Sequence, residues 1–359
     1  MMARSAVRLA AVGDICPGDH YFSFGHGAGS LSPGQRRQAL AALSPALKNT
    51  DIALCNLEGV LSLHSNVPDD PVEGRVFRGP PDWAMALREA GFTAVSVANN
   101  PSLQHGMDAF RNTVDACRQA GLDVVGLADD NGLPQPVLRT FGGIRVALLG
   151  ASFVPDPRRT SGTSYAAPGR SALLEQVSQL AATGACVVIA LHAGEEGRLL
   201  PDSETMSTID ALSDAGARLI LVHHSHVFQP VFRRGGSLVA SGLGDCLFDL
   251  HWHPALTSAA ALLTDIPAEG DIPYSLLPFR LTTGMELELM DDRRRQLFLQ
   301  ALDAWCTQLM QGRPGSSDQL GALQIRKALY FLLHLPQGES QLKLRFLGAK
   351  LRRRLGLAA

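Results

Sequence analysis

The feature that most constrains this chain is a short apolar segment that runs directly into three histidines. Residues 219–222 are branched and apolar, which is typical of a strand buried on both faces inside an α/β sheet. His223, His224 and His226 follow at once. Ligands collect beyond the carboxyl ends of strands in such sheets, and imidazole is a common metal ligand, so the pattern favours a metal site over a solvated loop.

Four other expected strands also end in polar side chains. They are followed by Asp14 (strand 7–12), Glu58 (strand 51–55), Asn99 and Asn100 (strand 93–98), and His192 (strand 185–191). Each residue alone has an ordinary explanation as a helix cap, a turn residue or a hydrogen-bonded core histidine. Together, carboxylate, amide and imidazole groups at strand ends suit a pair of divalent cations bridged by one carboxylate.

The hydrophobic periodicity predicts alternating strands and helices along most of the chain. Further strands are expected at 123–126, 145–150, 238–240, 259–265 and 281–289, and helices at 35–48, 81–90, 107–120, 171–183, 203–215, 293–310 and 319–335. The composition changes at Asp291. We therefore expect one α/β domain over residues 1–290 and a helical, basic C-terminal extension over residues 291–359.

The composition is that of an ordinary globular protein, with 46% apolar residues and a net charge of −2 over 359 residues. Since no basic excess exists to neutralise phosphates, we expect no nucleic-acid partner. The six cysteines are scattered without a CxxC pair, and we expect them to be reduced. The segment before Asp14 is too short for a signal peptide, and no apolar run reaches the roughly 18–20 residues of a membrane span. A cytoplasmic location is therefore expected.

The segment 343–354 carries six basic residues among leucines. One interpretation is a solvated helix face that packs on the main domain. The other is a peripheral, amphipathic contact with an anionic membrane or a protein partner. Only a membrane contact predicts that deleting residues 340–359 releases the protein from membranes.

Several motifs in the first 250 residues resemble those of a known family. They are Gly13-Asp14, Asn56-Leu57-Glu58, Phe77-Arg78-Gly79-Pro80-Pro81, Ala98-Asn99-Asn100 with Gly106, Leu191-His192-Ala193-Gly194 with Glu196, His223-His224-Ser225-His226-Val227, and Ser241-Gly242-Leu243-Gly244-Asp245 with Phe248-Asp249. Their order and spacing resemble the CapA type of poly-γ-glutamate capsule-biosynthesis proteins, a branch of the calcineurin-like metallophosphoesterase superfamily. The resemblance implies an α/β fold, a four-layer α/β/β/α sandwich with its ligands at one edge.

The resemblance also implies a cofactor of two divalent metal ions, Mn, Fe, Zn or Mg. The metal ligands that it implies are Asp14, Glu58, Asn100, His192, His224 and His226. Glu58 would bridge both ions, and Asp14 and His226 would serve the first. The substrate contacts that it implies are Arg78, Glu196 and Asn99.

Four positions depart from the family's pattern. Pro101 replaces the histidine of an NNH triplet, Gln104 an aspartate, Val222 a glycine and Asp245 an asparagine. Proline cannot transfer a proton, so the residue that resembles the superfamily's general acid is missing. The candidate catalytic residues are His105, which lies four positions beyond Pro101, His223, which would face the substrate, and Asp245, which would add negative charge beside the metals.

Two functions follow from these expectations. The first is a dinuclear-metal hydrolase or acyl- or phosphoryl-transfer enzyme, acting on a small-molecule or polymer substrate that carries phosphate or amide groups in capsule-polymer or secondary-metabolite biosynthesis. Loss of the general acid favours substrates with a good leaving group. The second is a catalytically degenerate binding or assembly component of a polyglutamate-type biosynthetic system. Metal-dependent turnover of a generic phosphodiester would separate the two.

Overall fold

Two β-sheets lie face to face in the computed structural model, which describes residues 6–67, 74–159, 164–312 and 319–354. The larger sheet runs in the order β16 (Leu287–Leu289), β15 (Tyr274–Leu281), β14 (Ser258–Pro267), β1 (Ala6–Ile15), β2 (Ile52–Leu57), β5 (Ala94–Ser96) and β6 (Asp123–Val125), with β13 (Asp245–Leu247) paired to β1 beside this path. The second sheet runs in the order β11 (Val231–Arg234), β12 (Ser237–Ala240), β10 (Ala217–His223), β9 (Cys186–His192), β8 (Ile144–Ser152) and β7 (Val137–Phe141). A short ribbon pairs β3 (Val60–Leu61) with β4 (Arg78–Gly79).

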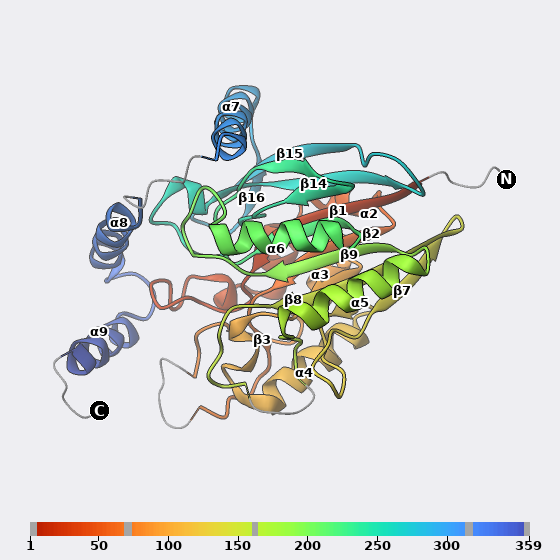
Figure 1. Ribbon diagram of the computed structural model, residues 1–359. Coiled ribbons are helices and arrows are strands. Elements are labelled where there is room, and N and C mark those ends of the chain that lie inside the picture. The colour runs from red at the N-terminus through yellow and green to blue at the C-terminus, as the bar shows by residue number, and fades with distance from the viewer. Residues whose placement is uncertain (1–5, 68–73, 160–163, 313–318, 355–359) are drawn as a thin grey trace.

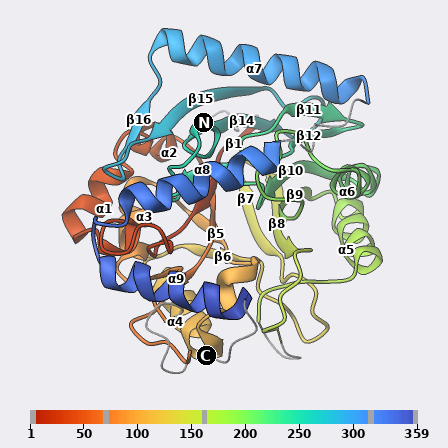
Figure 2. The ribbon, with the colours of Figure 1, turned by 90° about the vertical axis from the view of Figure 1, so that its left-hand side faces the viewer.

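Helices cover the outer face of each sheet, and Figure 2 shows the resulting layers from one side. On the side of the larger sheet lie α1 (Pro33–Ala39), α2 (Ser44–Lys48), α3 (Trp83–Ala90) and α4 (Gly106–Gln119), and on the second sheet lie α5 (Arg170–Ala182) and α6 (Ser203–Asp214). Short 3-10 turns occupy η1 (Ala28–Ser30), η2 (Asn100–Leu103) and η3 (Pro254–Leu256). The expected four-layer α/β/β/α class is confirmed.

Three further helices form the expected C-terminal extension: α7 (Asp292–Met310), α8 (Gln319–His334) and α9 (Ser340–Arg354). Helices α8 and α9 lie at the left of Figure 1 and across the front of Figure 2, whereas α7 lies at the top of both views, above β15. In the described ranges, no helix is both long enough and apolar enough to cross a membrane.

Strand β10 is buried on both faces, as its sequence predicts. Leu219 and Leu221 pack into the core between the two sheets, whereas Ile220 and Val222 pack into the core beneath α5 and α6. Each of these four side chains is at most 1% exposed. Because successive side chains of a strand point to opposite faces, only a continuous apolar run can fill both cores.

Two sequence expectations are wrong in the details of the fold. The helix expected over 35–48 is two helices, because Pro45 lies in the first turn of α2 and cannot continue a preceding helix. The strand expected over 281–289 includes a turn between β15 and β16, where Met285 has a φ of 61°. Strands β3, β4, β7, β11, β13 and β15 were not expected.

Replacing Leu221 by alanine tests the double-sided core. Leu221 is fully buried between the sheets, so we expect Leu221→Ala to lower the free energy of unfolding by about 2–5 kcal/mol through lost burial and a cavity. Chemical denaturation measures the change. Leu138→Ala is the matched control, because Leu138 is 51% exposed on β7 and its truncation should be nearly neutral. Equal effects of the two substitutions would contradict the layer assignment.

Candidate metal centre

The strand registers bring the polar strand ends together at one edge of the sandwich. In the larger sheet, Asp14 pairs across the backbone with Asn56 on β2 and with Asp245 on β13. In the second sheet, His192 at the end of β9 pairs with His223 at the end of β10. Both sheets therefore place their carboxyl-terminal side chains at the same edge.

A short segment that crosses from β12 to β13 connects the sheets at this edge. Leu243 donates its backbone N–H to Val222 of the second sheet at 3.0 Å, and Gly244 accepts from the Asp14 N–H of the larger sheet at 2.8 Å. Gly13 lies against this crossing, and a Cβ there would be 1.8 Å from the Gly244 carbonyl oxygen. The absence of a side chain at Gly13 is thus what allows the crossing to pass beside Asp14.

Asp14 is fully buried and is held in place from both sheets. Its Oδ1 accepts a hydrogen bond from Asn56 Nδ2 at 2.9 Å and lies 3.1 Å from His223 Nδ1. Its Oδ2 accepts from the His224 backbone N–H at 3.2 Å. Burial alone would raise the pKa of Asp14, but the hydrogen bond and the charge of His223, with the other nearby histidines, hold that pKa below its usual range.

The histidines of the cluster are fixed by polar neighbours. His226 Nδ1 lies 2.9 Å from Asp245 Oδ1, and His192 Nε2 lies 3.0 Å from Asn100 Oδ1. His192 and His224 have ring centroids 4.7 Å apart. His224 and His226 both adopt left-handed backbone, with φ of 92° and 57°, so the loop after β10 turns twice to direct these rings.

Three sets of side chains place ligand atoms within 4.8 Å of one another, and all are buried. They are Asp14, His226 and Asp245; Asp14, Glu58 and His192; and Glu58, His224 and His226. Asp14, Glu58 and His226 each belong to two sets, so the sets overlap as two neighbouring cation sites would. Asp245, expected beside the metals, belongs to one of them.

Several atoms at the cluster have no partner among the described residues. They are Glu58 Oε2, His223 Nε2, His224 Nδ1 and Asp245 Oδ2. A buried polar atom without a hydrogen bond costs free energy, about 1–3 kcal/mol each. Carboxylate and imidazole atoms that converge without protein partners fit divalent cations, which would use the lone pairs left open here.

Burial and mutual charge shift the other pKa values of the cluster. Burial and the Asp14 charge raise the pKa of Glu58 well above its usual value. Burial raises the pKa of Asp245 to about 7, although His226 pulls it down. Burial would lower the pKa of His226, but Asp245 and Glu58 outweigh it and raise that pKa. Burial and His226 lower the pKa of His224 to about 4, so this ring is neutral and ready to bind a cation.

A cleft of about 240 Å³ opens onto the cluster. Glu58, Asn100 and His226 form its polar floor, and Pro101 and Glu196 lie beside them. Pro101 therefore occupies the cleft wall where the family pattern has a histidine. The remaining wall is largely aromatic and was not expected from sequence; among its residues are Phe77, Phe248 and Trp252.

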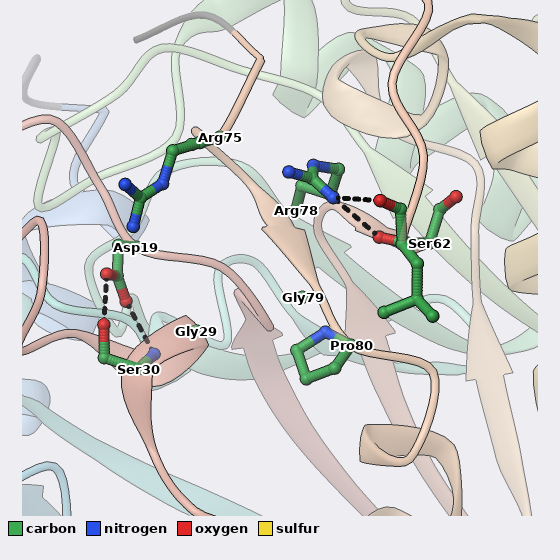
Figure 3. A pocket seen from close by; sticks show the side chains of 9 residues that line it. Asp19, Gly29, Ser30, Ser62, Arg75, Arg78, Gly79 and Pro80 are labelled. Carbon is green, nitrogen blue, oxygen red and sulfur yellow. Dashed lines mark hydrogen bonds between the residues drawn. The ribbon is translucent and has the colours of Figure 1, made fainter. Parts of the chain in front are cut away.

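The structure does not bring Arg78 to this cleft. Its Nη1 donates to the backbone oxygens of Ser62 and Leu63 at 3.2 and 2.8 Å, and its Nε donates to Gly74 at 2.8 Å. Figure 3 shows Arg78 directed to Ser62 in a separate hollow of about 230 Å³. The sequence motif around Arg78 thus fixes a loop, because its guanidinium donors are used on backbone carbonyls.

His105 and Asn99 also point elsewhere. The His105 ring contacts the Ser65 hydroxyl through Nδ1 at 2.8 Å and the Val76 carbonyl through Nε2 at 2.7 Å, and the residue is fully buried. With both ring nitrogens used in this way, His105 ties two loops together and does not reach the space beside Pro101. The Asn99 amide donates to Asn56 Oδ1 and to the Leu57 carbonyl beneath the cluster.

Asn56 is a residue whose role the sequence reasoning missed. Its Nδ2 donates to Asp14 and lies 3.4 Å from His192 Nδ1, and its Oδ1 accepts from Asn99. It therefore positions ligands that come from both sheets. The sequence did contain an indication of this role, since Asn56 is the first residue of the Asn56-Leu57-Glu58 motif.

Comparisons with known proteins find relatives with similar sequences. The capsule biosynthesis protein CapA of Bacillus anthracis is 29% identical over 264 residues, which cover 70% of this chain and 62% of that protein. The PGA biosynthesis protein CapA of Bacillus subtilis (strain 168) is 25% identical, over 60% of this chain and 58% of that protein. This chain thus spans about three fifths of the length of these two relatives. A probable polyglutamine synthesis accessory protein of Mycobacterium tuberculosis is 28% identical, over 68% of this chain and 69% of that protein.

Similarity to solved structures is weaker. A protein of Thermus thermophilus matches with a TM-score of 0.41 and 12% identity, over 74% of this chain and all of that chain. A 5'-nucleotidase from Candida albicans matches with a TM-score of 0.39 and 12% identity, over 76% of this chain and 52% of that chain. At these scores the likeness carries no argument about function.

The sequence match to a family model is decisive. Residues 8–250 match the model described as bacterial capsule synthesis protein PGA_cap, and this range contains every strand end that contributes to the cluster. The chain belongs to the PGA_cap family of bacterial capsule synthesis proteins.

Proposed function

We propose that this protein is a metal-dependent enzyme that hydrolyses or transfers a phosphoryl or acyl group in the synthesis of a capsule-type polymer or a secondary metabolite. The observation that carries the proposal is the convergence of Asp14, Glu58 and three histidines, with several of their ligand atoms left without partners among the described residues. An assembly component that binds no metal would gain nothing from burying these groups together.

The residues of the chain fit two divalent cations, which when bound lower the pKa of a water molecule and stabilise charge on a phosphoryl or carbonyl oxygen. Asp14 and His226 would hold one, His192, His224 and Asn100 the other, with Glu58 between them. Asn56 orients Asp14, and Asp245 orients His226. Such fixed contacts keep the ligands in place without rearrangement during the reaction.

The wall beside Asn100 limits the substrates. Pro101 offers no proton, and the His105 nitrogens are engaged by Ser65 and Val76. A leaving group must therefore depart without protonation by either residue, which favours acyl phosphates and aryl esters over alkyl esters.

Metal content and turnover test the proposal together. Elemental analysis of the purified protein should find about two divalent ions per chain, as in a two-metal site. Glu58→Ala and His224→Ala should each lose metal, because each removes a ligand. The metal-loaded protein should hydrolyse acetyl phosphate and p-nitrophenyl esters but not glycerol 3-phosphate.

His64→Ala is the control for these substitutions, since His64 is an exposed histidine outside the cluster. It should keep both metal and activity. Metal without turnover of any ester would favour the degenerate binding or assembly component. Absence of metal from a folded protein would contradict the proposed enzyme and leave a degenerate scaffold that binds something else.

The pKa shifts predict that metal affinity rises with pH. Glu58 and the Asp245–His226 pair hold protons more tightly in the metal-free cluster than in water, and these protons must leave before a cation binds. Apparent affinity for Mn²⁺ should therefore increase between roughly pH 6 and pH 8. Competition with a chromophoric chelator at several pH values measures it.

Asp245→Asn is the informative variant for this pH dependence. It removes the carboxyl whose pKa is raised to about 7 and keeps a side chain of the same shape. The rise of affinity with pH should be shallower in this variant than in the parent protein. An affinity that does not change with pH would show that the cluster is already deprotonated.

We infer that the C-terminal helices contact an anionic membrane surface. Apolar side chains that face away from the sandwich are exposed on both helices, among them Ile325, Leu329, Leu332 and Leu333 on α8 and Leu344, Leu347 and Leu351 on α9. The segment 343–354 has six basic residues and no acidic one. Exposed leucines with neighbouring positive charge fit an interfacial, anionic lipid surface. Lys343 does not take part, because it is fully buried.

Vesicle sedimentation tests this membrane contact. The full chain should sediment with vesicles that contain phosphatidylserine and less with pure phosphatidylcholine vesicles. Leu329→Gln with Leu333→Gln should reduce sedimentation, because both side chains are more than half exposed on α8. Leu138→Gln is the control, an exposed leucine on β7. Equal sedimentation of all variants, or none of the parent protein, would contradict the inference.

A further inference from the structure

Helix α8 forms part of the wall of the metal cleft. Lys327 lines the same cleft of about 240 Å³ as Glu58, Asn100 and His226. Residues 8–250 match the family model, so α8 lies outside the matched part of the chain. The cleft therefore combines a floor from the family's motifs with a cationic side chain that those motifs do not contain.

One face of α8 packs against aromatic residues of the main domain. The Phe331 ring centroid lies 5.2 Å from that of Phe22, and the Tyr330 centroid lies 6.3 Å from that of Trp252. Lys327 lies one turn before them on the same face, since residues three and four apart are neighbours on a helix. The apolar contacts of this face orient Lys327 toward the cleft.

The turn between α8 and α9 is fastened to the domain as well. Glu339 pairs with the Arg75 guanidinium through both of its carboxylate oxygens. Lys343 Nζ donates to the His334 and Gln337 carbonyls at 2.8 and 2.9 Å, which satisfies one backbone oxygen at the end of α8 and one in the turn that follows. Several contacts thus hold α8 and the turn after it against the main domain.

The position of the Lys327 ammonium group is fixed by two rings. Its Nζ lies 5.3 Å from the centroid of Phe22 and 5.0 Å from that of Trp252, within the range of cation–π attraction. Arg158 also lines the cleft, and Glu196 contributes an opposing charge. The cleft therefore offers cationic groups to a ligand beyond its metal-binding floor.

We propose that Lys327 determines substrate specificity by binding a second oxyanion group, a carboxylate or a phosphate, remote from the bond that reacts at the cluster. The proposal rests on the metal centre put forward above and adds to it a substrate class: molecules that carry two anionic groups. An ammonium group held on an aromatic wall pairs with an oxyanion more strongly than one in bulk water.

A purely structural role for Lys327 is the competing explanation, because its cation–π contacts also hold α8 in place. The two explanations differ in what removal of the charge does. Loss of a structural anchor disturbs the cleft and weakens the binding of all ligands. Loss of a recognition group weakens the binding of only those ligands that reach it. A pair of probes with and without a second anion therefore separates them.

Calorimetric titration of the Mn²⁺-loaded protein, with all 359 residues, provides the test. The probes are ω-carboxyalkylphosphonates of increasing chain length, the matching bisphosphonates, and alkylphosphonates that lack the second anion. At the chain length that reaches Lys327, Lys327→Met should weaken a two-anion probe about tenfold, the loss expected for one charge-assisted hydrogen bond. Its effect on alkylphosphonates should be less than about twofold. Comparing the affinities of the carboxyalkylphosphonates and the bisphosphonates identifies whether the lysine prefers a carboxylate or a phosphonate.

Two further variants complete the experiment. Lys327→Arg keeps the charge and should retain most of the preference for two-anion probes. Arg326→Met removes a positive charge from the adjacent, exposed position of α8 and should change neither class of probe. Hydrogen exchange of α8 checks that each variant keeps the helix docked.

Equal weakening of both probe classes by Lys327→Met, or no weakening of either, would overturn the proposal, as would the same loss in Arg326→Met. Metal content is measured on the same samples, and the titrations are repeated without metal. Absence of metal would contradict the proposed enzyme centre. The titrations without metal would still compare probes with and without a second anion, and so decide the role of Lys327. Failure of every form to bind two-anion probes more tightly than alkylphosphonates would also overturn it.

Discussion

The structure depends on one fully buried carboxylate, that of Asp14. A charge in the interior must be compensated, and here the compensation comes from Asn56 in one sheet and from His223 and the His224 backbone in the other. The packing of the two sheets and the position of the cluster are therefore not independent. A shift of one sheet relative to the other would remove hydrogen bonds from a buried charge, which the fold cannot sustain at low cost.

The need to hold the buried Asp14 carboxylate in place also explains why residues that bind nothing themselves are important near the cluster. Gly13 makes room for the Gly244 carbonyl, and that carbonyl accepts the Asp14 N–H. The left-handed backbone at His224 and His226 lets two rings that are two positions apart face the same volume. Strand ends supply the ligands, and tight backbone geometry determines how they converge.

Sequence reasoning predicted the parts of the fold that depend on local pattern. The apolar run 219–222 predicted a doubly buried strand, and polar residues after five strands predicted a common edge. It failed where a long-range contact decides the outcome. The His105 partners, Ser65 and Val76, are 40 and 29 residues away, so nothing near Pro101 shows that both ring nitrogens are occupied. Lys327 lies at least 75 residues beyond every other residue that lines the cleft, and no periodicity indicates that contact.

The origin of Lys327 in α8 has a consequence for how such proteins diversify. The candidate ligand side chains come from strand ends within residues 8–250, while Lys327, which lines the same cleft, comes from a helix beyond that range. If Lys327 acts as proposed, relatives with different C-terminal helices would accept different molecules while the groups at the strand ends stay the same. Selectivity would then vary separately from the cluster at the strand ends.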